Sequence, residues 1–162
     1  MNAYLPKKPI WSDQDFEVMG WHDVTLWSMV AYPDNFEFLV DMDYIFNWVH
    51  PGPGETYFKF WVAPVTMVFE NASDVRINVD SQQGCIEIAE FHRELLGPSP
   101  NGKYTQYRFK FDCQEGEIAL EATSFKMYLR RPPTLLDRQS FGLAERGGVN
   151  FSCTYTGEPI ST

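Results

Sequence analysis

WHDVTLWSMVAYPDNFEFLVDMDYIFNW, residues 21–48, carries the densest apolar pattern of the chain and predicts a β-hairpin. Its turn signal is YPDNF at 32–36, where proline presets φ for the first turn position and Asp and Asn favour the following ones. A three-residue loop with Asn35 in the left-handed region places Tyr32 opposite Phe36. The facing pairs that follow are Val30–Phe38, Ser28–Val40, Leu26–Met42 and Val24–Tyr44.

This register gives the hairpin one apolar face and one acidic face. The apolar face is built from the facing pairs, and a slip by one residue would turn the acids into it, so the slip is disfavoured. His22 falls at the edge of the apolar face while Asp23 points to the other, so the two are not expected to bind one ion together. The acidic face carries Trp21, Asp23, Thr25, Trp27, Met29, Glu37, Leu39, Asp41 and Asp43.

The rest of the chain also favours strands over helices. Aromatic residues make up 16% of the sequence, and turn signals recur about every 8 to 15 residues. The pattern predicts an all-β or β-dominated α+β fold, an antiparallel β-sandwich or flattened barrel with one or two short helices, for instance within 135–141. We expect a single domain over 1–162, with an irregular lead-in at 1–16 and a mostly irregular segment at 132–162. Further predicted strands are 56–70, 75–79, 85–95, 104–113 and 117–130.

Charge and composition narrow the possible partners. A net charge of −9 predicts repulsion from nucleic acid and from anionic membranes, and attraction to a basic protein. The chain has neither an apolar run of eighteen residues nor an apolar signal-peptide region near its start. Three widely spaced cysteines, Cys85, Cys113 and Cys153, argue against a disulfide framework and against a zinc site of the CxxC kind. We therefore expect a cytoplasmic protein without a cofactor.

Asp23, Asp41 and Asp43 are the acids that the hairpin brings to one face. Carboxylate oxygens are the ligands that Ca²⁺ and Mg²⁺ prefer, so these three are the candidate metal ligands. Carboxylates that share a face repel one another unless a positive charge neutralises them. A metal ion, a basic protein partner and arginines of this same chain all satisfy that requirement, and the sequence leaves the three interpretations open.

Arg130, Arg131 and Arg146 form the main basic concentration. Arginines bind phosphate and carboxylate groups through paired N–H donors, and Gly147 and Gly148 allow a close approach of the backbone, so an anion site is one interpretation. The other is that these arginines pair with the acids of the hairpin and belong to the scaffold.

Four tryptophans and one tyrosine also have two possible roles, in the core or in a binding surface. Trp21, Trp27, Trp48, Tyr57 and Trp61 are predicted to pack in the core or to line a pocket. No P-loop, GxGxxG or HExxH motif is present, and no Ser or Cys lies in a catalytic pattern. The pair His22-Asp23 shares its letters with the metal phosphohydrolases but lacks their further histidine and aspartate spacing. No catalytic residue is assigned.

One stretch supports a resemblance. Gly20-Trp21-His22-Asp23, an alternating strand, and then LVDMDYI at 39–45 with Trp48 resemble a pattern in small uncharacterised bacterial β-rich proteins, some of them similar to immunity proteins of polymorphic toxin systems. The resemblance covers about thirty residues and carries no catalytic residues over. It implies a bacterial cytoplasmic protein that acts by binding.

Three functional hypotheses follow from the sequence. The first is a non-enzymatic binding protein that neutralises a basic toxin through a partner-binding surface of Asp23, Trp27, Glu37, Asp41 and Asp43. The second is an enzyme that uses a metal or a small ligand at Asp23, Asp41 and Asp43 or at the arginine cluster. The third is a ligand-binding β-sandwich with an aromatic pocket.

Overall fold

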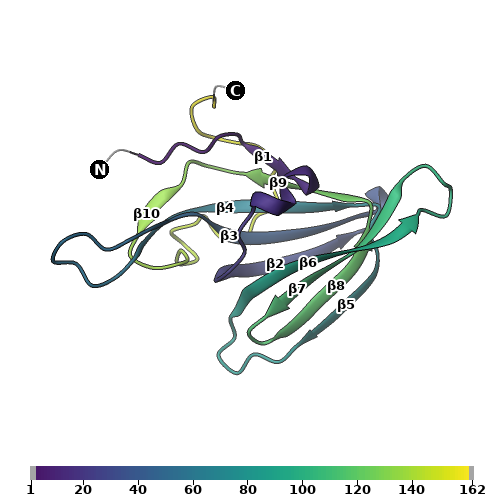
Figure 1. Cartoon of the computed structure of the whole chain (residues 1–162), viewed down its shortest axis with the longest axis horizontal. Coiled ribbons are helices and arrows are strands. Elements are labelled where there is room, and N and C mark those ends of the chain that lie inside the picture. Colours follow the sequence, from purple (N-terminus) through teal and green to yellow (C-terminus); the bar gives the residue numbers. More distant parts are fainter. Residues whose placement is uncertain (1–2, 161–162) are drawn as a thin grey trace.

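The computed structural model describes residues 3–160 and confirms the predicted all-β fold class (Figure 1). The strands form one antiparallel sheet in the order β1-β9-β4-β3-β2-β6-β7-β8-β5, with β10 also paired to β4, and the sheet is not closed into a barrel. The elements are β1 (Ile10–Ser12), the 3₁₀ helix η1 (Asp13–Val18), β2 (Val24–Tyr32), the 3₁₀ turn η2 (Pro33–Asn35), β3 (Glu37–Val49), β4 (Lys59–Glu70), β5 (Ser73–Val79), β6 (Ile86–Pro98), β7 (Thr105–Cys113), β8 (Gly116–Ala122), β9 (Ser124–Leu129) and β10 (Thr134–Leu136).

The sheet folds over itself around a cluster of phenylalanines. Phe69 of β4 and Phe109 of β7 lie four places apart in the strand order, yet their ring centroids are 5.4 Å apart. Phe125 of β9 also reaches Phe109, at 5.6 Å. These rings are completely buried, and the edge-to-face geometry that many of them adopt is the one aromatic quadrupoles favour. The main core therefore lies between the two halves of one bent sheet.

Two strands pass from one half of the sheet to the other at a shared corner. Strand β4 leads into β5 through Asn71, which takes a left-handed φ of 52°, and β8 leads into β9 through Thr123. The backbone N–H of Thr123 donates to the carbonyl of Glu70, and the Asn71 amide donates to the Thr123 hydroxyl at 2.9 Å. The side chains of the corner thus satisfy polar groups that the bend removes from the ladder.

The opening hairpin forms as β2 and β3, with a register that differs from the predicted one near the turn. The left-handed residue is Phe36 rather than Asn35, so the loop has one more residue and Tyr32 pairs with Glu37. A β-bulge at Trp27 removes this one-residue offset, and Leu26 faces Met42 as predicted. Beyond the bulge the two faces of β2 are exchanged relative to the prediction: Met29 packs against the core, whereas Val30, which was predicted to be on the apolar face, is 41% exposed.

Pro64 lies inside β4, where its missing N–H requires an explanation. On one side it pairs with Asp43 of β3. On the other side β10 pairs with β4 up to Val62 and β9 pairs with it from Val65, so the proline falls in the gap between these two partners. The predicted interruption is therefore a change of neighbouring strand, which costs the sheet no hydrogen bond.

The two ends of the chain cover opposite faces of the sheet. The lead-in is not irregular throughout, because β1 pairs with β9 and a Ser12 capping box begins η1. The C-terminal segment lies behind β3 and β4 in Figure 1, and the helical turns expected within 135–141 are wrong, since strand β10 and bends occupy that range. Among residues 3–160 no helix has the length and apolarity needed to cross a membrane.

Gly116 provides a test of the β7–β8 turn and of the β5 edge beside it. Its φ is +148°, and a Cβ at this position would clash with the carbonyl oxygen of Asn78. We expect Gly116→Ala to lower the free energy of unfolding by about 1–3 kcal/mol, measured by urea denaturation. Gly142→Ala is the control, because that glycine has open space and no left-handed φ. Equal stability of the two variants would contradict the described turn.

Candidate functional site

A buried ion-pair cluster lies on the back of β3. Asp41 and Asp43 are both 0% exposed. Arg146 binds Asp41 through two parallel bonds, Nη1 to Oδ2 at 2.8 Å and Nη2 to Oδ1 at 2.6 Å, while its Nε donates to Asp43 Oδ1 at 3.0 Å. The guanidinium also stacks 5.0 Å from the ring of Trp27, whose Nε1 donates to Asp43 at 2.8 Å. One arginine thus bridges both carboxylates.

Arg130 completes the neutralisation of the cluster. Its Nη2 donates to Asp41 Oδ1 at 2.8 Å, and its Nη1 donates to the carbonyls of Val65 and Asn150 and to the Thr66 hydroxyl. The backbone N–H of Asn150 donates to the other oxygen of Asp41 at 2.9 Å. Two carboxylates therefore face two guanidinium groups with nearly every lone pair and proton used, which is the condition that makes buried charge tolerable.

The pKa of Arg146 reflects this balance. Burial acts to lower it, but the hydrogen bonds and charges of Asp41 and Asp43 act in the opposite direction and outweigh burial, so the pKa lies above its ordinary value. The arginine stays charged in its buried position. The cluster fastens the segment after β10 to the back of the sheet, because Arg146, Asn150 and the backbone N–H of Phe141 all donate to β3.

This arrangement corrects several predicted roles. Asp41 and Asp43 cannot meet a protein partner directly, because they are fully buried. Their oxygens are occupied by arginine and backbone donors, which also removes them as metal ligands. Arg130 and Arg146 are in turn occupied by these acids, so the anion-site interpretation fails for them. The alternative, in which the chain's own arginines neutralise the acidic face, is confirmed.

The remaining residues of the predicted partner surface do not form one acidic face. Asp23 is mostly buried and accepts a bond from Gln139 at 2.7 Å. Trp27 packs inside the ion-pair cluster, and Glu37 lies near the far end of the hairpin. His22 and Asp23 are not on opposite faces as predicted: Asp23 has a left-handed φ of 66°, and the His22 Nε2 lies 3.5 Å from its carboxylate.

Arg131 and one exposed cluster stand apart from this network. Arg131 stacks 4.7 Å from the Phe141 ring and donates to the Glu145 carbonyl. On β6 and β7 the potential ligand atoms of Glu90, His92 and Asp112 lie within 4.8 Å of one another, a group that sequence reasoning did not select. His92 Nε2 is already 2.6 Å from Asp112, and Lys110 is 3.4 Å from the same carboxylate, so these contacts already pair the charges at the surface.

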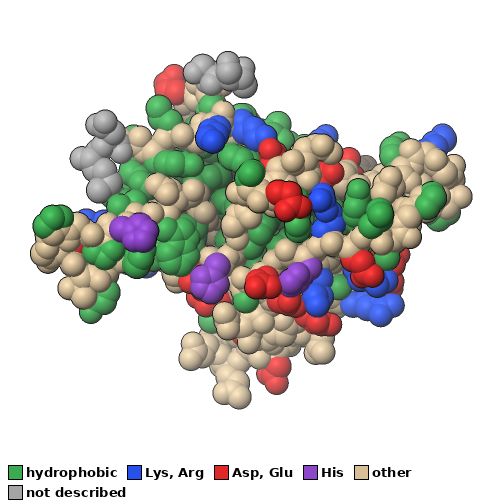
Figure 2. Space-filling model, viewed as in Figure 1, with side chains coloured by type: hydrophobic (Ala, Val, Ile, Leu, Met, Phe, Trp, Pro, Cys, Tyr) green, Lys and Arg blue, Asp and Glu red, His purple; other side chains and the backbone are tan. Residues whose placement is uncertain are grey.

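An aromatic cavity of about 720 Å³ lies on the front of the sheet. It lies between the N-terminal segment, η1 and the loop that follows it, and the C-terminal half of β3; Figure 2 shows a broad area of hydrophobic side chains on this face. The volume is within the range of small-molecule sites. Its aromatic walls are Tyr4, Trp11, Trp21, Tyr44, Phe46 and Trp48.

The walls are held by contacts among residues far apart in sequence. Tyr44 meets the Phe46 ring at 4.8 Å and the Trp21 ring at 5.3 Å, and its hydroxyl accepts a bond from the Gly20 N–H at 3.1 Å. Burial raises the pKa of Tyr44 and that of Tyr4, so both phenols stay protonated at neutral pH. At one rim His22 stacks on Trp48, with centroids 6.1 Å apart and planes 14° from parallel.

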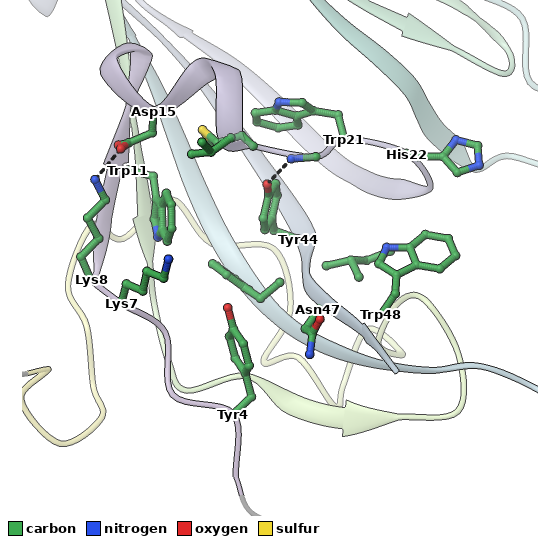
Figure 3. Close-up of a pocket in the computed structure, with 15 residues that line it drawn as sticks. Tyr4, Lys7, Lys8, Trp11, Asp15, Trp21, His22, Tyr44, Asn47 and Trp48 are labelled. Atoms are coloured by element: carbon green, nitrogen blue, oxygen red, sulfur yellow. Dashed lines mark hydrogen bonds and ion pairs between the residues drawn. The ribbon is translucent and has the colours of Figure 1, made fainter. Parts of the chain in front are cut away.

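Two indole donors lie enclosed beside the cavity. The Nε1 atoms of Trp11 and Trp21 are buried, and neither has a hydrogen-bond partner among the described residues. Because these atoms have almost no accessible surface, a molecule in the cavity would not reach them in this arrangement. Figure 3 shows the Tyr4 hydroxyl and the Lys7 ammonium turned toward the space. These two donors are the polar groups that a bound acceptor would meet.

Sequence reasoning found only part of this cavity. Five aromatic residues were considered for a pocket, and Trp21 and Trp48 line it. Trp27 is in the ion-pair cluster, Tyr57 is 81% exposed, and Trp61 is outside the lining, with its ring stacked 6.3 Å from that of Tyr4. Tyr4 and Lys7 were missed because the lead-in was treated as a connection. A signal was present, since two prolines stiffen a short segment that holds two aromatic residues and two lysines.

Arg146→Met tests the ion-pair cluster. The variant leaves two carboxylates buried with only one guanidinium, so we expect the free energy of unfolding to fall by about 3–5 kcal/mol, measured by chemical denaturation. Arg138→Met removes an exposed arginine of the same segment and is expected to change stability by about 0.5 kcal/mol or less. If both variants unfold at the same denaturant concentration, the cluster does not fasten the C-terminal segment.

Comparison of the chain with protein-family models, curated proteins and solved structures finds no match. The resemblance of residues 20–48 to toxin-immunity proteins stays a prediction.

Proposed function

We propose that this chain is a non-enzymatic binding protein that takes a small, largely apolar ligand into the aromatic cavity. The observation that carries the proposal is the cavity itself: about 720 Å³ lined by six aromatic side chains, with the Tyr4 hydroxyl and the Lys7 ammonium turned toward the space. Sites for small molecules combine mostly apolar walls with a few placed polar groups, and this cavity has that composition.

The proposal is supported over the protein-neutralising hypothesis by where the charges lie. That hypothesis was built on Asp41 and Asp43, which are buried against arginines. Its remaining support is the short resemblance of residues 20–48 and the net charge of −9, and a net charge of this size is also what keeps many proteins soluble. A metal-dependent reaction at the same acids loses its ligands for the same reason. The cavity is the better-supported site.

The proposal also assigns a role to the ion-pair cluster. Strand β3 carries Asp41 and Asp43 on its back, and its next residues, Tyr44 to Trp48, form one wall of the cavity. A strand fixed from behind presents its aromatic residues in one arrangement. A preformed wall lowers the entropy that a ligand must supply on binding.

A neutral fluorescent probe tests cavity binding. N-phenyl-1-naphthylamine brightens in an apolar site, and we expect saturable 1:1 binding to the wild-type protein. Asn47 is exposed at the cavity wall, so Asn47→Trp fills the site without disturbing the core and should weaken probe binding about tenfold or more. Gln82→Trp, in an exposed turn away from the cavity, is the matched control and should bind the probe as the wild type does. An unchanged affinity in Asn47→Trp, or no saturable binding at all, would overturn the proposal.

A further inference from the structure

We infer that the ligand of this cavity is an anion with an aromatic or otherwise apolar body, whose acidic group binds at Lys7. The inference rests on the proposed function and deepens it by naming the chemical class of the ligand. Three observations carry it: the charges of the lining, the kind of polar group that faces the space, and the shape of the walls.

The lining carries more positive than negative charge, in a chain whose net charge is −9. It contains two lysines, Lys7 and Lys8, against one carboxylate, Asp15. Lys8 Nζ lies 2.6 Å from Asp15 Oδ1, and the other oxygen accepts the Ser12 N–H at 2.9 Å. Lys8 is therefore neutralised.

Lys7 is the cation that remains. Among the described residues it makes no ion pair, although acidic side chains are abundant elsewhere on the molecule. Its ammonium points toward the interior of the cavity in Figure 3. Partial burial acts to raise the pKa of Asp15, but the Lys8 and Ser12 hydrogen bonds outweigh it and leave the pKa below its ordinary value. Asp15 thus stays paired with Lys8 and does not compensate Lys7.

The polar groups that face the space are donors. Figure 3 shows the Lys7 ammonium and the Tyr4 hydroxyl turned toward it. An ammonium group cannot accept a hydrogen bond, so its partner has to bring an acceptor. A carboxylate or sulfonate offers several acceptor oxygens together with the negative charge that would pair with Lys7. One acidic group on the ligand therefore suits both donors.

The aromatic walls determine the shape and polarity of the remainder of the ligand. Aromatic side chains that surround a space of this size favour a flat apolar body. Such cavities also take cations, which bind to the faces of aromatic rings. Here an unpaired lysine turned into the space would repel a cationic ligand, and Lys8 already lies 4.9 Å from the Trp11 ring centre. The charge of the lining therefore favours an anionic ligand over a cationic one.

Two probes that differ by one group test the inference. 8-Anilinonaphthalene-1-sulfonate carries the rings of N-phenyl-1-naphthylamine plus a sulfonate, so their affinities isolate the contribution of the anion. We expect the wild-type protein to bind the sulfonate more tightly. Because Lys7 is exposed, Lys7→Met should weaken sulfonate binding about two- to fivefold and leave the affinity for the neutral probe unchanged. Lys103→Met, an exposed lysine in the β6–β7 loop, is the control and should change neither.

The outcomes separate this inference from the proposed function. If the neutral probe binds and Asn47→Trp weakens it, but the sulfonate gains nothing and Lys7→Met has no effect, the cavity binds apolar ligands and the anion inference is wrong. If Asn47→Trp leaves sulfonate binding unchanged, the sulfonate binds elsewhere and the inference is also wrong. Failure of both probes to saturate would overturn the proposed function itself.

Discussion

The bidentate pairing of Arg146 with Asp41, extended to Asp43, is the interaction on which the rest of the structure depends. It places two negative charges of a central strand in the interior, where they are tolerable only because guanidinium and backbone donors reach almost every oxygen. Those donors come from a segment about a hundred residues later in the chain. The cluster therefore makes the packing of the C-terminal segment on β3 a requirement of the fold.

The front of the same strand shows what this attachment permits. Residues directly after the two acids turn aromatic side chains toward the N-terminal segment, and the space between them stays open as the cavity. The two faces of β3 thus have different tasks. The back carries paired charges that hold the strand in place, whereas the front carries the apolar rings that line the cavity opposite Lys7 of the N-terminal segment.

Much of the fold could be predicted from local patterns. Alternation of apolar and polar residues in the β7 and β8 segments identified a hairpin, and the buried Phe109 and Phe111 lie on the predicted face. The register of the opening hairpin was less predictable, because Phe36 rather than Asn35 takes the left-handed conformation and a bulge at Trp27 compensates. Both adjustments depend on which side chains are buried in the core, and the core includes strands that lie outside the local sequence pattern.

The sequence by itself determined the all-β class, the apolar face of the opening hairpin and the need for positive charge beside Asp41 and Asp43, because side-chain alternation and like-charge repulsion act between near neighbours. It left open whether a metal, a partner or the chain itself supplies that charge. Only the tertiary structure shows that Arg130 and Arg146 supply this charge, because the pairing depends on which distant segments of the chain meet across the sheet. The cavity was decided in the same way, because its walls come from the lead-in, the loop before β2 and the end of β3.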